Sequence, residues 1–516
     1  MSMIPRSVLA SLARPTGFLS LTGLVLALSA GPAPAQGFSP TGPLVAKRAR
    51  AAAAPARDQV LVAGGSGFGG VCLPMRSAEL YSPAAGAFAP TGDLVHSRCE
   101  ARAVALEDGR VLVVGGFGDG IGDAELFDPN SGSFSLTGPL IEARGAGFTL
   151  TRLDDGRVLV AGGDNFSGTI DTAELYDPAT NSFAPAGVLT TPRSLHTSTL
   201  LADGRVLLAG GGAGFTCLPV AATAELFDPN AGTFTATAGA PVAPLWGHAE
   251  ARLAGGGVLL AGGEPTCGLS SSAGTRAAQV FDPVSGSFAA TGDMLDVHGP
   301  GVAATRVPDG RVLVTGGIAG TDPVPTGELF DPQADSFGEG AVMSSRRAFH
   351  AQVLLPDGTV LVAGGEQSIS GVTASADIFD APSLPVLEAR VDVLPDTLNL
   401  KSEGRFITMF IGVPGHRPGE IDARSIRLRI GGVGSLAPIA GSRGIGDHDG
   451  DGVGDLMLKF SRAQVVALAP VGHAVPFEAT GALKDGTPLA GADLVRVICP
   501  GHGTCGSAGP HSRGPH

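Results

Sequence analysis

Short apolar runs recur along the chain at nearly even spacing, and each run ends in two glycines. The glycine pairs stand at 64–65, 115–116, 162–163, 210–211, 262–263, 316–317 and 364–365. Each run is continuously apolar, which predicts a short strand covered on both faces by neighbouring sheets. The glycines end the strand where a side chain would collide or a positive φ is required. A repeat of about 50 residues is typical of propellers and solenoids, so the pattern predicts one of these two architectures.

Each repeat predicts four strands. In the unit that begins at His196, the apolar stretch 196–202 turns at Asp203-Gly204 into the strand that ends in the glycine pair. The third strand is the phrase AELFDP at 224–229, and the fourth surrounds Phe234. No part of residues 38–385 keeps a 3.6-residue apolar period, so we expect almost no helix there.

The seventh repeat lacks its fourth strand. After Pro382 no copy of the fourth-strand phrase follows, whereas GFSPTGPL at 37–44 is an isolated copy that precedes the first unit. An open sheet edge is a liability, and a ring removes it only when its two ends pair. We therefore expect residues 38–44 to complete the seventh sheet.

The double glycine after an apolar strand, with an aromatic residue in the next strand, occurs in all seven units and resembles the kelch family. The resemblance covers residues 38–385 and implies an all-β, seven-bladed kelch-like propeller of the galactose-oxidase type. This chain has mostly Phe where the family has Tyr and Trp. Copper radical oxidases of this type use tyrosine ligands, but Tyr81 and Tyr176 share one structural repeat position, so the copper ligands are missing.

Composition outside the repeats predicts three further parts. In residues 1–35 two arginines, the apolar run 17–30 and the small residues Ala33 and Ala35 are typical of a secretory signal peptide. The run is too short to span a bilayer of about 30 Å, so we expect no membrane span. Residues 36–385 form the propeller, alternating runs in 386–498 predict a small β-sandwich-like domain, and 499–516 is expected to be a flexible tail. We expect a secreted or cell-surface monomer, with the periplasm also possible.

The cysteine count is even, and export permits disulfides. We expect the pairs Cys72–Cys99, Cys217–Cys267 and Cys499–Cys505. A Cys72–Cys217 link is the alternative, because the triplet CLP occurs at both positions. The net charge of −14 argues against nucleic acid as a partner.

An aspartate-rich loop, DHDGDGVGD, lies at 447–455. Calcium takes about six to eight oxygen ligands on a flexible loop, and alternate aspartates supply them. The expected Ca²⁺ ligands are Asp447, Asp449, Asp451, the carbonyl of Val453, and Asp455. Leu458 at the twelfth position is not an EF-hand ligand, so the loop instead resembles those of dockerins and thrombospondin type 3 repeats. A solvated acidic turn is the alternative.

Basic residues recur at the connections between repeats and at the start of each innermost strand. They predict a ring on the face that bears the loops after the double glycines, and a ring of this kind could bind an acidic peptide or a sugar carboxylate. The expected ligand-binding residues are Arg98, Arg193, His196, His248, Arg347 and His350. The alternative is a solvated channel rim.

The sequence contains no G-x-S-x-G, H-E-x-x-H or P-loop motif and predicts no catalytic residue. We therefore expect a binding or adhesion protein whose partner is a protein or a glycan. A lyase or mutarotase acting on polysaccharides or sugar acids through the same face is one alternative, and a cell-surface spacer is another.

Overall fold

The computed structural model describes residues 37–498, except for 213–221, 244, 266–273, 369, 382–386, 396, 401–403, 424, 432, 440–442, 447–453 and 484–486. Nearly all regular structure in these residues is β-strand, which confirms the predicted all-β class. The described residues hold one α-helix, α1 (Arg462–Leu468), and one 3₁₀ turn, η1 (Pro418–Glu420).

Seven four-stranded antiparallel sheets, here called blades 1 to 7, are built from residues 37–380. Strands are given from the innermost outwards. Blade 1 comprises β2 (Ala52–Ala56), β3 (Gln59–Ala63), β4 (Ala78–Ser82) and β5 (Ala87–Pro90), and blade 2 comprises β7 (Arg102–Ala105), β8 (Val111–Val114), β10 (Ala124–Asp128) and β11 (Ser133–Leu136). Blade 3 comprises β12 (Thr149–Arg152), β13 (Val158–Ala161), β16 (Thr172–Asp177) and β17 (Ser182–Val188).

The remaining blades repeat this order. Blade 4 comprises β18 (Thr197–Leu200), β19 (Val206–Ala209), β20 (Ala224–Asp228) and β21 (Thr233–Ala236), and blade 5 comprises β22 (Ala249–Arg252), β23 (Val258–Ala261), β24 (Ala278–Asp282) and β25 (Ser287–Ala290). Blade 6 comprises β26 (Val302–Arg306), β27 (Val312–Gly316), β30 (Thr326–Asp331) and β31 (Ser336–Val342). Blade 7 comprises β32 (Ala351–Leu354), β33 (Val360–Ala363), β34 (Ala376–Asp380) and β1 (Gly37–Thr41). Each innermost strand contacts those of the two adjacent blades, and β32 contacts β2, so the series is cyclic.

Strand β1 forms the outer strand of blade 7. It pairs antiparallel with β34 in a register that sets Phe38 opposite Phe379. This confirms that the isolated N-terminal copy of the fourth-strand phrase pairs with the seventh unit. The other six blades have an equivalent cross-strand aromatic pair, with ring centroids 4.8–5.0 Å apart.

The continuously apolar second strands are buried between two neighbouring blades. Val111 and Val113 of β8 pack with Leu61 of blade 1, whereas Leu112 and Val114 pack with residues of blade 3. Successive side chains of a strand point to opposite faces, and here both faces are covered. This arrangement explains why these strands show no polar alternation.

The double glycines join neighbouring blades through the backbone. The second glycine of each pair donates its N–H, over 2.8–3.1 Å, to a carbonyl in the connection that leads into the next blade. The seven acceptors are the carbonyls of Arg98, Arg144, Arg193, Leu245, His298, Arg347 and Arg48. The first glycine must lack a side chain, since a Cβ at Gly64 or Gly162 would lie 2.5 Å from the carbonyl oxygen of Arg98 or Arg193.

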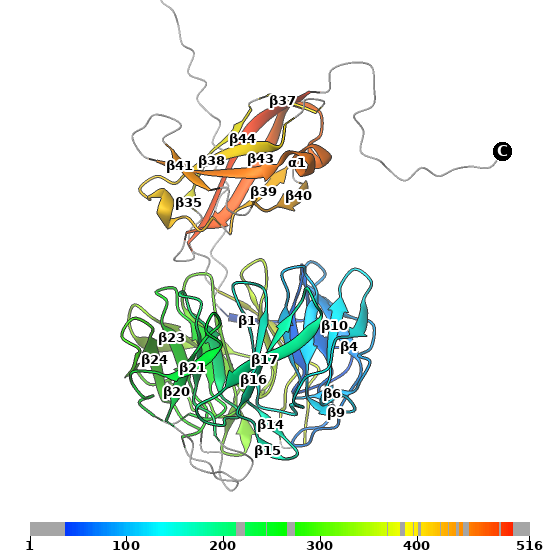
Figure 1. Cartoon of the computed structure of the whole chain (residues 1–516), viewed down its shortest axis with the longest axis vertical. Coiled ribbons are helices and arrows are strands. Elements are labelled where there is room, and N and C mark those ends of the chain that lie inside the picture. The colour runs from blue at the N-terminus through cyan, green and yellow to red at the C-terminus, as the bar shows by residue number, and fades with distance from the viewer. Residues whose placement is uncertain are drawn as a thin grey trace, which may run out of the picture. The chain divides into compact units, whose positions relative to one another are not determined.

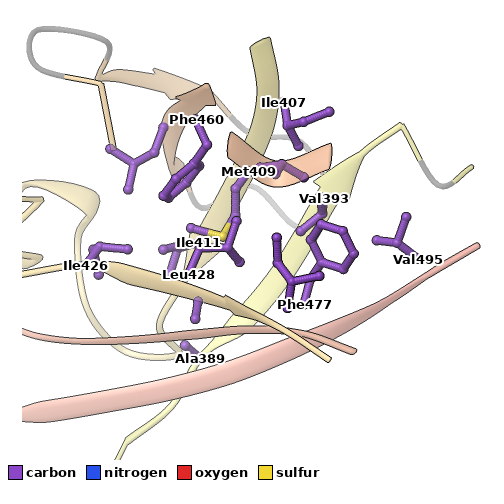
Figure 2. Packing of buried hydrophobic residues seen from close by; sticks show 14 of the residues in the cluster. Ala389, Val393, Ile407, Met409, Ile411, Ile426, Leu428, Phe460, Phe477 and Val495 are labelled. Carbon is purple, nitrogen blue, oxygen red and sulfur yellow. The ribbon is translucent and has the colours of Figure 1, made fainter. Parts of the chain in front are cut away.

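Residues 387–498 form two further sheets around a separate core. The first comprises β35 (Leu387–Glu388), β37 (Thr397–Asn399), β39 (Arg427–Ile430), β40 (Val433–Leu436), β43 (Gly472–Ala482) and β44 (Pro488–Ile498); the second comprises β36 (Arg390–Leu394), β38 (Phe406–Gly412), β41 (Gly444–Gly446) and β42 (Asp455–Ser461). Alternate residues of β38, such as Met409 and Ile411, pack with Leu428 and Phe477 of the other sheet (Figure 2). This is the β-sandwich-like organisation that the alternating sequence pattern predicts.

Candidate ligand-binding site

The three arginines expected on an exposed ring are instead buried within the blades. Arg98, Arg193 and Arg347 are 0–1% exposed and form ion pairs of 2.6–2.9 Å with Glu125, Glu225 and Asp377. Each also donates to the carbonyl of the first glycine in its own blade, as Arg193 Nη1 does to Gly210 at 2.6 Å. The expectation of an exposed ligand-binding ring is therefore corrected for these residues, because their guanidinium groups are enclosed and already paired.

The same kind of buried pair recurs in other blades and explains why an acid is repeated in the third-strand phrase. Arg48 pairs with Glu79, Arg144 with Glu174, and His298 with Glu328. The acid also accepts backbone N–H groups of the connection before its blade, as Glu225 does from Thr190 at 2.7 Å. Burial lowers the pKa of Arg193 and of Arg347, while the partner carboxylates act in the opposite direction. These ion pairs therefore have a structural role, because they hold the connection against the third strand of its blade.

Blade 5 replaces both members of this pair with uncharged residues. Leu245 occupies the arginine position, and Gln279 occupies the acid position. The Gln279 amide accepts from the N–H of Val242 at 2.6 Å and donates to the carbonyl of Ala243 at 3.2 Å. An uncharged amide thus makes the hydrogen bonds to the connection that a carboxylate makes in other blades. The arginine and the acid are therefore replaced together in this blade.

The three expected histidines pack between blades at the wall of the central channel. His196 and His248 are 4% and 6% exposed, and His350 is half-buried. Burial lowers the pKa of His196 well below its usual value, that of His248 to about 4 and that of His350 to about 3. Each ring lies close to the first glycine of the preceding blade, and its Nε2 shares a hydrogen bond with a threonine hydroxyl. These histidines are uncharged at pH 7 and fill space between the blades, so they add no charge to the site.

A cavity of about 690 Å³ lies along the axis of the ring. Residues from the innermost strands of all seven blades line it, and most of them are small or carry hydroxyl groups. The hydroxyl-bearing residues are Thr149, Ser194, Thr197 and Ser198, and ten alanines, including Ala103, Ala249 and Ala303, make up much of the remaining wall. Small side chains at the axis leave the space open, so the cavity follows from the sequence of these strands.

One residue per blade, just before the innermost strand, adopts a left-handed backbone. The seven equivalent positions have φ between 51° and 81° and are Arg50, Glu100, Gly147, Leu195, Gly247, Gly301 and Phe349. Backbone hydrogen bonds link several neighbours, as from Arg50 N to the Phe349 carbonyl at 2.9 Å and from Glu100 N to the Arg50 carbonyl at 3.1 Å. Glycine suits this conformation, and a bulky residue there is unusual. Four blades nevertheless place a side chain here, and all four side chains line the cavity.

Arg50 is the centre of a polar cluster at the mouth of the cavity, the end at which the innermost strands begin. It pairs with Glu100 and, through Nε at 2.8 Å, with Glu366, and its guanidinium lies 4.0 Å from the ring centroid of Phe349. Burial acts to lower the pKa of Arg50, but the charges of Glu100 and Glu366 outweigh it and raise this pKa. The cluster joins blades 7, 1 and 2 in a single arrangement.

Aromatic side chains gather on the same side of the ring. Trp246 and Phe117 line the cavity, and the 84% exposed Phe166 packs against Phe117 in a tilted arrangement with ring centroids 5.7 Å apart. Phe166 lies between the short strands β14 (Asp164–Asn165) and β15 (Gly168–Thr169), and Phe117 begins β9 (Phe117–Gly118), which pairs with β6 (Arg98–Cys99). Figure 1 shows these four short strands along one edge of the seven-blade unit. This edge is called the loop face below.

Two ionisable residues lie deeper in the cavity, on the innermost strands of blades 2 and 5. Arg102 of β7 is exposed to the cavity. Glu250 of β22 accepts a hydrogen bond from Ser198 N at 3.1 Å and another from the Thr199 hydroxyl. Burial raises the pKa of Glu250 to about 7, although these hydrogen bonds and the charge of Arg102 oppose the shift. Sequence reasoning missed both residues, because no other blade has a charged residue at either position, so neither position shows a repeated signal.

Cys72 and Cys99 form the one cysteine pair that lies in the described residues, with Cα atoms 6.0 Å apart. The pair ties the loop of blade 1, which carries the half-exposed Phe68, Val71 and Leu73, to the connection before blade 2. Cys217, Cys267, Cys499 and Cys505 lie outside the described residues, so those two predicted pairs stay predictions.

The predicted calcium loop connects two paired strands. Gly446 of β41 is opposite Asp455 of β42, so 447–454 is the connection between them. Asp455 is 8% exposed, and its carboxylate faces Gly412. Asp447, Asp449, Asp451 and Val453 lie outside the described residues. Among the residues that the structure does describe, no group of three or more His, Cys, Asp or Glu side chains could hold a metal ion.

Comparisons with known proteins assign no family. No protein-family model matches the chain, and no curated protein matches it. The chain is similar to the solved structure of a fungal alcohol oxidase of the AA5 family in complex with copper, with a TM-score of 0.41 and 18% identity over 87% of this chain and 85% of that one. A similarity at this level does not establish a ligand or an activity for this chain.

Neither tyrosine of the chain lines the axial cavity among the residues that the structure describes. Both tyrosines lie in third strands, away from the axial cavity, and their hydroxyl groups bond to Thr41 Oγ1 and Asn181 Oδ1 at 2.9 and 2.8 Å. Among the described helices, none is long and apolar enough to cross a membrane.

Proposed function

We propose that this protein is an exported carbohydrate-binding propeller whose ligand is bound in the axial cavity from the loop face. The cavity itself supports the proposal most directly. Its volume of about 690 Å³ falls in the range of about 300–1,000 Å³ that is typical of small-molecule sites. Seven strands enclose it, so a bound sugar would be largely removed from water.

The chemistry of the wall suits a polyhydroxylated ligand. Hydroxyl groups such as those of Thr149, Thr197 and Ser198 can both donate and accept hydrogen bonds with sugar hydroxyls. Trp246 and Phe117 supply flat apolar surfaces next to them, against which the C–H face of a sugar ring can pack. A site of this kind combines apolar contact area with a few fixed polar groups.

The mouth of the cavity is already ordered without a ligand. Arg50 is held by two carboxylates and by the ring of Phe349, so its position is fixed before binding. Groups that need not be ordered on binding cost less conformational entropy, which favours affinity. Retaining a side chain at a left-handed position, where glycine would fit more easily, also fits a role at the site.

The test is a glycan array with purified protein, followed by calorimetric titration of the best ligand into matched variants. Trp246→Ala removes the aromatic surface at the start of blade 5, and Val284→Ala alters a 94% exposed residue on the outer turn of the same blade. We expect Trp246→Ala to weaken binding by about tenfold or more and Val284→Ala to leave it unchanged. Equal affinity of both folded variants would contradict the proposed site.

Glu250 supports a second candidate function, an enzyme acting on the same sugar. A carboxyl group with a pKa of about 7 can give or accept a proton at neutral pH, as a general acid or base must. In that case Glu250→Gln would still bind the saccharide but would form no product. Product analysis by mass spectrometry of wild type and variant distinguishes this candidate from simple binding.

A further inference from the structure

Arg102 is the charged side chain of the cavity that has no partner in the described residues. It lies on the innermost strand of blade 2, exposed to the axial cavity, and no described residue forms an ion pair or hydrogen bond with its guanidinium group. The six other arginines that face carboxylates in the blades or at the mouth are paired. The N–H groups of such an arginine can donate hydrogen bonds to a ligand that enters the cavity.

The other charged groups of the cavity are already committed. Glu100 pairs with Arg50 at the mouth, and the buried Asp164 accepts a hydrogen bond from the Thr169 hydroxyl at 2.7 Å. His196, His248 and His350 are neutral near pH 7, because burial lowers their pKa values. Glu250 therefore remains as the counter-charge to Arg102.

Glu250 balances Arg102 only in part. Its carboxylate is held on blade 4 by Ser198 N and the Thr199 hydroxyl, and it does not reach ion-pair distance of Arg102. The adjacent strand β26, on the other side of β22, presents Val302, Ala303 and Ala304, which do not titrate. Because burial raises the pKa of Glu250 to about 7, the cavity gains net positive charge as the pH falls below neutrality.

We infer that Arg102 binds a carboxylate of the ligand, so that the saccharide bound in the axial cavity is acidic, a uronic acid or an oligomer of one. This inference rests on the proposed carbohydrate-binding function. A guanidinium group offers two parallel N–H donors that match both oxygens of a carboxylate. Inside a cavity the effective dielectric constant is lower than in bulk water, so such a charge-assisted pair is stronger there than at an open surface.

The cavity favours a sugar acid over an acidic peptide. Its wall offers side-chain hydroxyls on the neighbouring blades 3 and 4, from Thr149, Thr197 and Ser198, which suits a compact ring bearing many hydroxyl groups. A peptide would need partners for its backbone groups along an extended path. An acidic peptide is nevertheless a distinct outcome of the test below.

The experiment uses the mature full-length protein and three probes, trigalacturonate, its methyl ester and hexaglutamate, in calorimetric titrations. Arg102→Gln removes the charge, and Arg102→Lys retains the charge without the planar guanidinium group. Arg110→Gln changes an arginine in the turn between β7 and β8 of the same blade that is already paired with Asp108. We expect Arg102→Gln to weaken trigalacturonate binding by about tenfold or more, Arg102→Lys to weaken it less, and Arg110→Gln to have no effect.

Three outcomes separate the inference from the proposed function. If the methyl ester binds as tightly as trigalacturonate and Arg102→Gln binds both normally, the role of Arg102 is refuted while sugar binding stands. If hexaglutamate binds in an Arg102-dependent way and no saccharide binds, both are refuted. Trigalacturonate binding that weakens as the pH rises through 7 in the wild type, and that loses this dependence in Glu250→Gln, would support the inference further.

Discussion

The aromatic ring of Phe38 in β1 lies against that of Phe379 in the last blade, with ring centroids 5.0 Å apart. The pair is equivalent to Tyr81–Phe88 in blade 1, where a single hairpin supplies both residues. In blade 7 the two residues come from opposite ends of the repeat region. Within the described residues, noncovalent contacts therefore hold the outer strand of the last blade in place.

Loss of this contact should open the ring. We expect Phe38→Ala to destabilise the protein by about 2–4 kcal/mol and to promote aggregation, because β1 can then leave and expose the edge of β34. Phe88→Ala removes the equivalent ring from a strand that its hairpin holds in place, so it should lower stability without the same aggregation. Thermal unfolding with light scattering measures both effects. Similar aggregation of the two variants would show that the terminal strand is not the weak point.

The buried arginine–acid pairs should be costly to break and inexpensive to replace as a pair. We expect Arg193→Leu alone to lower the free energy of unfolding by about 3–5 kcal/mol, since Glu225 would be left buried without its cation. The double variant Arg193→Leu/Glu225→Gln copies the Leu245 and Gln279 arrangement of blade 5 and should recover most of that loss. Chemical denaturation gives both values. A double variant as unstable as the single one would show that the two residues act independently.

Glu250 should make stability depend on pH in a defined direction. An unfolded glutamate has a pKa of about 4.3, whereas burial raises the pKa of Glu250 to about 7 in the fold. Between these values the folded state keeps the proton and the unfolded state loses it, so this residue's contribution to stability falls as the pH rises.

The measurement is the difference in melting temperature between Glu250→Gln and wild type at several pH values. We expect the melting temperature of Glu250→Gln, relative to that of the wild type, to be lowest near pH 4, to increase as the pH rises, and to level off above pH 7. The histidines are present in both proteins, so their opposite dependence cancels in the difference. A difference that stays constant from pH 4 to 8 would contradict a buried, protonated Glu250.

The order of strands and the closure by β1 could be predicted from the sequence, because each blade repeats the same phrase. The burial of Arg98, Arg193 and Arg347 could not be predicted in the same way, since a charged residue in a connection usually faces solvent. A signal was nevertheless present: blade 5 lacks both the arginine and the acid, as Leu245 and Gln279 show. Two positions that lose their charges together indicate a pair.

The axial cavity is harder to predict for a physical reason. Arg102 and Glu250 come from different blades and from different positions within their strands, so no repeat relates them. They approach one another only because seven innermost strands converge on one axis. Likewise, the left-handed backbone at Arg50 and Phe349 is marked in the sequence only by the glycines at equivalent positions in blades 3, 5 and 6.

The aspartate loop at 447–455 should bind calcium and stabilise the residues around β41 and β42. At tenfold excess over Kd, Ca²⁺ would add about 1.4 kcal/mol to the stability of the C-terminal sheets. Scanning calorimetry with and without EDTA should show a lower melting temperature for these sheets and no change for the blades. Asp449→Asn/Asp451→Asn should abolish the difference, and an EDTA-insensitive wild type would remove calcium from this account.

The central claim is that the ligand occupies the axial cavity, and filling the cavity tests it most directly. Ala303 lines the cavity from blade 6, so Ala303→Phe would place a ring in the space that the ligand needs, whereas Ala334→Phe adds the same ring to an exposed turn of that blade. The measurement is calorimetric titration of the best array saccharide into both variants, each with its melting temperature. We predict that Ala303→Phe abolishes binding while it remains folded and that Ala334→Phe binds as the wild type does. Unchanged affinity in a folded Ala303→Phe variant would contradict the claim.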